Sequence, residues 1–219
     1  MLDSNLSTAQ LILISIIPVL FAIVLHEVAH GWAAYRLGDR TAMMLGRLSL
    51  NPVKHIDPIG TILVPAILIL TVNFAFGWAK PVPIDWRNFK NPKRDTALVA
   101  IAGPAANLAM AFGWGFIAAI ASILPDDLAQ FSQPLLNMAF IGVFFNVLLM
   151  VFNLIPVPPT DGGRIAVSLL PPTAGNLLSK VEPFGLVLLL LLIFTGVLWQ
   201  FIIPVIQTIS VLIFSLFGV

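Results

Sequence analysis

The sequence predicts an all-α polytopic membrane protein with about four to six transmembrane helices and a re-entrant or short β segment between the first and third hydrophobic regions. Hydrophobic residues make up 59% of the 219 residues and charged residues 10%, roughly 40% of the charged share that is usual for a soluble domain. Five apolar regions are long enough to be candidate spans. The chain has no internal repeat, so residues 1–219 are expected to form a single integral-membrane domain.

The five regions cover residues 11–35, 59–76, 97–124, 135–155 and 184–219. The first is expected to be a retained span, because no small-residue cleavage site follows it. Basic loops flank the second on both sides, so a full crossing would place one loop on the wrong face of the membrane. A re-entrant hairpin with strand-like flanks is expected instead. The last region predicts either one tilted helix with a tail or two short spans hinged near Pro204.

The basic residues predict the orientation. All eleven Lys and Arg follow the first region, precede the third or follow the fourth. The connection between the third and fourth regions carries Asp126 and Asp127 and no cation, and the N-terminus carries Asp3. Because basic residues favour the cytoplasmic side, the N-terminus and this connection are expected outside.

Composition also excludes some partners and ligands. The net charge is +1 and the cations are scattered, which does not suit binding to nucleic acid. The chain has no cysteine, so any metal site must use His, Asp or Glu. The lipid bilayer is the partner that the composition predicts.

Residues 24–31 read VLHEVAHG inside the first apolar region. Each ionisable group at the centre of a span costs about 2.5 to 3.5 kcal/mol on insertion scales, so a chance occurrence or a simple polar contact between helices is disfavoured. His26 and His30 share one helix face, and Glu27 lies beside them. This is the zinc-hydrolase pattern, in which zinc lowers the pKa of water to about 7 and a carboxylate moves the proton.

A catalytic zinc ion normally takes three protein ligands. Residues 152–164, FNLIPVPPTDGGR, offer Asp161, although a proline-rich helix end with an Asp turn is the alternative. His26 lies roughly 22 Å along its helix from Leu11, which places it in the cytoplasmic half of the bilayer. The fourth apolar region ends at the same depth, so Asp161 is the expected third ligand.

Several motifs together resemble the site-2 protease family of intramembrane zinc metalloproteases. The resemblance rests on HEVAH, on AGPAANL at 102–108 and on NLIPVPPTDGG at 153–163. NPVKHIDPIG at 51–60 and FGWAKPVPI at 76–84 resemble a compact subgroup without PDZ or CBS domains. The resemblance covers the core motifs, about residues 11–170, and leaves hydrophobic helices at 184–219 after them.

The resemblance implies a role for individual residues. It implies that one zinc ion per chain is bound by His26, His30 and Asp161, that Glu27 is the general base, and that Asn153 assists the substrate carbonyl. Thr160 stands where the family usually has Leu before the aspartate.

Four further polar residues are less specific. Asn107 and Asn146 are candidates for support of the ligands or for substrate binding, with polar packing between helices as the alternative. His55 and Asp57 lie in a turn-like loop and are expected to be structural or gating residues rather than ligands.

The predicted function is that of an intramembrane zinc metalloendopeptidase, which hydrolyses a peptide bond in or near a transmembrane segment of a protein substrate. The substrate would have to unwind locally and could add as a strand to the suspected β segment. The alternative is a transporter or metal-permeation protein that uses the same His, Glu and Asp side chains as an ion path. That path would need polar residues through the whole bilayer depth. A binding scaffold without activity is disfavoured by the intact Glu27.

Overall fold

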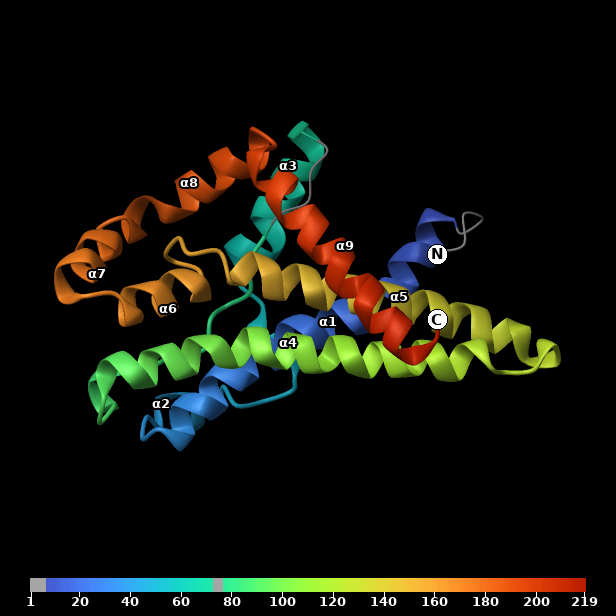
Figure 1. Ribbon diagram of the computed structural model, residues 1–219, viewed down its shortest axis with the longest axis horizontal. Helices are drawn as coiled ribbons and strands as arrows, with labels where there is room; N and C mark the ends of the chain where they lie inside the picture. Colours follow the sequence, from blue (N-terminus) through green and yellow to red (C-terminus); the bar gives the residue numbers. More distant parts are fainter. Residues whose placement is uncertain (1–6, 73–76) are drawn as a thin grey trace.

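The computed structural model describes residues 7–72 and 77–219, and within these ranges the chain forms helices and no β-strand (Figure 1). The α-helices are α1 (Thr8–Arg36), α2 (Thr41–Met44), α3 (Val64–Val72), α4 (Pro92–Ser122), α5 (Ala129–Asn153), α6 (Asp161–Leu169), α7 (Pro172–Ser179), α8 (Glu182–Phe194) and α9 (Val197–Phe217). Short helical turns are η1 (Pro52–His55), η2 (Pro58–Leu63), η3 (Trp86–Asn88) and η4 (Asp126–Leu128).

Among the described residues, α1, α4, α5 and α9 are each long and apolar enough to cross a membrane. Helices α7 and α8 add a fifth candidate if the pair, which is bent by 66°, is taken as one broken span. The predicted class, an all-α polytopic membrane protein, is therefore confirmed.

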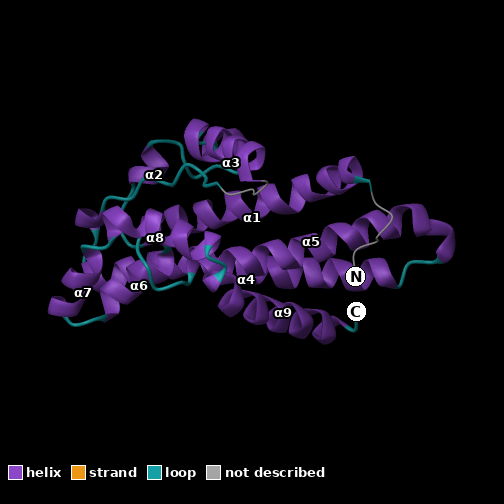
Figure 2. Cartoon of the chain, turned by 90° about the horizontal axis from the view of Figure 1, so that it is seen from above, coloured by secondary structure: helices purple, strands orange, loops and turns teal. Residues whose placement is uncertain are grey.

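Helices α1, α4 and α5 run side by side and form the centre of the bundle, with α9 packed against α4 and α5 (Figures 1 and 2). Small side chains allow this close packing. On α5, for example, a Cβ atom added to Gly142 would lie 2.3 Å from the Trp114 ring of α4. The close approach brings the polar side chains of the three helices into contact inside an otherwise apolar bundle.

The proline-rich segment after α5 places Asp161 at the first residue of α6. The Thr160 side chain caps α6 by accepting a hydrogen bond from Gly163 N at 3.2 Å, and its hydroxyl donates to Ile155 O at 2.5 Å. A leucine could make neither bond, so the threonine at this position is a helix cap. Gly162 is required for the tight return, because a Cβ there would lie 2.3 Å from the carbonyl carbon of Leu154.

The structure describes the course of two apolar regions that the sequence left open, the second and the last. Residues 58–71 form an apolar helical stretch shorter than a span, and residues 73–76 of the predicted second region lie outside the described residues. The break in the last region lies at Gly196, which has a φ of 77°, and not near Pro204, which is inside α9. Glycine adopts this left-handed conformation without strain, whereas a proline within a transmembrane helix is tolerated without a break.

The expected β segment is not formed in the described part of the chain. Residues 77–85 have no regular secondary structure, and they bond to other main chain where Trp78 N donates to Gly60 O (3.0 Å) and Lys80 N donates to His55 O (2.9 Å). Pro81 and Pro83 have no N–H, so the pairing cannot continue as a ladder.

Candidate metal centre

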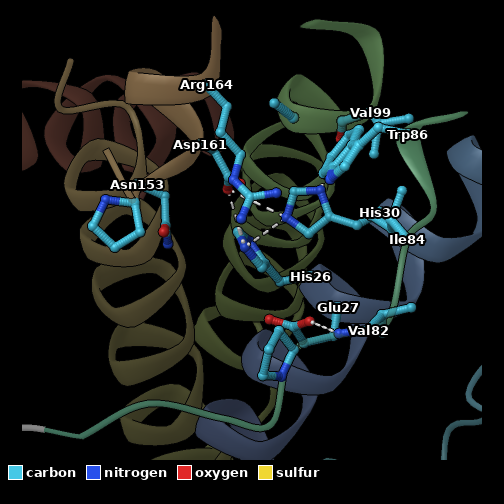
Figure 3. Close-up of a pocket in the computed structure, with 13 residues that line it drawn as sticks. His26, Glu27, His30, Val82, Ile84, Trp86, Val99, Asn153, Asp161 and Arg164 are labelled. Atoms are coloured by element: carbon cyan, nitrogen blue, oxygen red, sulfur yellow. Dashed lines mark hydrogen bonds and ion pairs between the residues drawn. The ribbon is translucent and has the colours of Figure 1, made fainter. Parts of the chain in front are cut away.

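Three side chains from α1 and α6 converge at one point of the bundle (Figure 3). His26 Nε2 and His30 Nε2 lie 3.1 Å apart, and each lies 3.3 Å from Asp161 Oδ2. In a tetrahedral zinc site with ligand bonds of about 2.0 to 2.1 Å, neighbouring ligand atoms lie about 3.3 Å apart. The three atoms thus have the spacing of one face of such a site.

The donor atoms also have the chemistry that a cation requires. Asp161 Oδ2 is buried and accepts no hydrogen bond within the described structure. His30 Nδ1 lies 2.7 Å from Val99 O, and because a carbonyl only accepts, Nδ1 carries the proton and Nε2 presents a lone pair. Lone pairs that face one another without a hydrogen repel, so a bound cation such as Zn²⁺ fits this group.

Asn107 fixes the orientation and the protonated nitrogen of the other histidine, His26. His26 Nδ1 lies 2.6 Å from Asn107 Oδ1, while Asn107 Nδ2 donates to Ala22 O at 3.2 Å and to Asn146 Oδ1 at 3.0 Å. Asn146 Nδ2 in turn donates to Gly142 O at 2.8 Å. Because the amide of Asn107 uses its nitrogen elsewhere, its oxygen faces His26 and holds the proton on Nδ1. Both asparagines are fully buried and contact the ligands or one another, and neither lines the cavity.

A glycine of α4 lies directly against the two imidazoles. A Cβ atom added to Gly103 would lie 2.3 Å from His30 Nε2 and 2.6 Å from His26 Cε1. The motif that contains Gly103 and Asn107 therefore serves both helix packing and the shape of the candidate metal centre.

The ligand atoms open onto a cavity of about 300 Å³. It is lined by His26, Glu27, His30, Pro81, Val82, Ile84, Trp86, Val99, Ala100, Asn153, Pro159, Asp161 and Arg164. Glu27 Oε2 accepts a hydrogen bond from Val82 N at 2.9 Å, and Oε1 accepts none from the described residues. Asn153 Nδ2 uses one hydrogen on Leu149 O at 2.9 Å, which leaves its second hydrogen free for a ligand.

The loop residues His55 and Asp57 lie outside this group. His55 is buried and contacts Ser49 O through Nε2 at 2.8 Å. The Asp57 carboxylate caps the turn at Pro58 by accepting bonds from Ile59 N and Gly60 N at 3.0 and 2.7 Å. Both contacts are structural.

Arg164 is a cavity residue that the sequence interpretation missed. Its guanidinium carbon lies 5.1 Å from the centre of the Trp86 ring, and the side chain forms no hydrogen bond or ion pair with the residues that the structure describes (Figure 3). The spacing gave a signal, because a residue three positions after Asp161 shares its helix face. A cation without an anionic partner in a cavity is suited to bind an anionic or strongly polarised ligand.

Fold and site together define a polytopic membrane protein with a buried His-His-carboxylate centre and an adjacent glutamate, the class of the membrane-embedded metallohydrolases. The model of Peptidase family M50 matches residues 115–196. The chain is 41% identical to the Bacillus subtilis protein named "Putative zinc metalloprotease YwhC", over 84% of this chain and 83% of that protein.

It is also 30% identical to the Mycolicibacterium smegmatis protein named "Putative zinc metalloprotease Rip2", over 83% of this chain and 68% of that protein. No solved structure matches significantly. The chain belongs to peptidase family M50 and is a zinc metalloprotease, which confirms the family predicted from the motifs.

Proposed function

We propose that this metalloprotease hydrolyses a peptide bond in or near a transmembrane segment of a membrane-protein substrate. The observation that carries the proposal is the placement of the ligand triad and Glu27 on one cavity between helices that are apolar enough to span a bilayer. We place the N-terminus outside and the cavity in the cytoplasmic half, on the distribution of the basic residues.

Six polar residues of the cavity each have a role in the proposed hydrolysis that suits their chemistry. His26, His30 and Asp161 would hold one zinc ion, which when bound supplies a Lewis acid that acidifies water and polarises a carbonyl. Glu27 accepts a proton from the attacking water on Oε1, as the water oxygen bonds to the scissile carbonyl carbon. Glu27 then returns that proton to the amide nitrogen as the C–N bond breaks.

Asn153 and Arg164 would bind the substrate carbonyl oxygen, on which negative charge develops. Both line the cavity, and both have donors that the described residues leave free. Hydrogen-bond donors that are already in place favour the transition state because they need no reorganisation.

An ion path is not favoured as the function. The titratable side chains that line the cavity come from one level of α1 and the start of α6, and the relatives are named as proteases. A permeation route would need polar side chains along the whole span.

The test is cleavage of a panel of single-span membrane proteins by the purified chain in detergent, with the zinc content measured in parallel. Wild-type protein is expected to cleave at least one substrate within or beside its span. Glu27→Gln should retain zinc and lose cleavage by about a hundredfold or more, because the amide cannot accept the proton. Cleavage close to the wild-type rate by zinc-loaded Glu27→Gln would refute the mechanism.

A further inference from the structure

Residues 77–85, here called the strap, pass along the cavity with Pro81, Val82 and Ile84 and are anchored on either side of these residues. Arg47 Nη2 donates to Lys80 O at 2.9 Å, and Asp85 N donates to Asp39 Oδ2 at 2.9 Å. Between these anchors, Val82 N donates to Glu27 Oε2 at 2.9 Å (Figure 3). The strap therefore connects the loops that follow α1 with the side chain proposed as the general base.

The sequence of the strap leaves one main-chain donor for the contact with Glu27 and restricts the orientation of that donor. Proline has no N–H and a fixed φ, so in Pro81-Val82-Pro83 only Val82 has an amide hydrogen. A residue that precedes proline is also held in extended conformations. The two rings thus leave a single main-chain donor with little freedom to turn away from Glu27.

The Val82 side chain is seated on α1 itself. It is 6% exposed, and a Cβ atom added to Gly31 would lie 2.8 Å from Val82 Cγ1 and 2.6 Å from Leu48 Cδ2. Gly31 lies four residues after Glu27 and so on the same face of α1, one turn further along. The glycine that follows His30 therefore leaves the space in which Val82 docks beside Glu27.

We propose that the main-chain amide of Val82, docked on Gly31, is the positioning group of the general base. A glutamate side chain has three rotatable bonds, and the amide holds one of its oxygens so that the other stays free to accept the proton from water. Val82 acts through Glu27 and transfers no proton itself. The inference rests on the proposed function, and it assigns the base a partner from outside the zinc-binding helices.

The kinetic test compares Val82→Pro with Val82→Ala, because both remove the isopropyl group and only proline removes the N–H. Val82→Pro is expected to have a kcat about 10- to 100-fold below that of Val82→Ala, the range for loss of a hydrogen bond to a charged group. The KM values of the two variants should agree within about twofold, and so should their zinc contents, since no ligand or substrate contact is removed. Equal kcat values, or faster cleavage by Val82→Pro, would overturn the inference.

A second measurement is independent of proteolysis. In the segment 81–83 only the Val82 amide can exchange its hydrogen. Hydrogen–deuterium exchange is therefore measured on overlapping peptides whose difference isolates this amide from the other amides of the strap. Slow exchange is expected in the wild type and in Glu27→Gln, whose side-chain oxygen still accepts, and faster exchange in Glu27→Ala. Unchanged exchange in Glu27→Ala would overturn the contact. Failure of the whole panel to be cleaved would refute the proposed function and leave this measurement to decide on the Val82 contact.

Discussion

Gly103→Ala should remove zinc from this protein although glycine binds nothing itself. The added methyl group would lie 2.3 Å from His30 Nε2, whereas ordinary van der Waals contact begins at 3.4 Å. The methyl and the imidazole must therefore separate by about 1.1 Å. Metal sites tolerate deviations of only about 0.2 Å in ligand distance, so His30 can no longer bind in register with His26 and Asp161.

The expected loss of zinc affinity is about 100-fold or more. Changes that disturb only the support of a ligand cost about 10- to 100-fold, and here the nitrogen of the ligand is itself displaced. The assay is a competition titration against a zinc chelator with the purified protein, followed by elemental analysis.

The control is Gly113→Ala on the same helix. Gly113 also lies within α4, but no atom lies within 4 Å of a Cβ placed there, so the same substitution should leave zinc affinity unchanged. Equal affinities of Gly103→Ala and the wild type would refute the assignment of His26 and His30 as ligands in this geometry.

Three further predictions concern the ligands, the cavity cation and an acid-sensitive anchor. Asp161→Ala should lose zinc on dialysis against a moderate chelator, because two protein ligands remain, while His55→Ala should keep it; the reverse pattern would move the centre to the loop after α1. Arg164→Ala should lower kcat by about 100-fold at unchanged zinc content, the cost of one donor to the developing oxyanion, and Arg164→Lys should restore part of the rate; equal rates of all three proteins would remove Arg164 from catalysis. Burial raises the pKa of Asp39, but hydrogen bonds from Thr41, Asn88 and the Asp85 main chain outweigh burial and lower it. A carboxylate whose pKa is lowered by folding stabilises the folded state at pH values above the ordinary carboxyl pKa of about 3.9. The difference in melting temperature between wild type and Asp39→Asn should therefore be constant from pH 7 to about pH 5 and shrink as the pH falls further. A difference that grows toward pH 3 would contradict the assigned bonds.

Helix periodicity and insertion cost explain what the sequence could predict. Two histidines four residues apart share a helix face wherever the helix packs, and three prolines within residues 156–159 end α5, which a single proline inside a span does not do. The spans and the set of His26, His30 and Asp161 were therefore accessible from residue types and spacing. These assignments remain predictions for zinc analysis to test.

Contacts that use main-chain atoms were not accessible in this way. The residue type does not single out the Val82 amide, since every residue except proline has a main-chain N–H. Its role depends on where the strap lies in the folded protein. The break at Gly196 was missed for a related reason: Pro204 lacks a donor but can stay helical, whereas the φ of Gly196 is a conformation that the residue type permits and does not demand.

The division of the ligands between α1 and α6 affects the protein during its synthesis. His26 and His30 leave the ribosome early, but Asp161, the proposed third donor, comes only after α4 and α5. Helix α1 packs against both of these helices, and α6 packs against α4. A nascent chain that ends before Asp161 carries two histidines and a glutamate but no complete set of donors. If the proposed ligand set is the one used, the metal site can be completed only after synthesis has passed Asp161, and we expect shorter translation products to lack proteolytic activity.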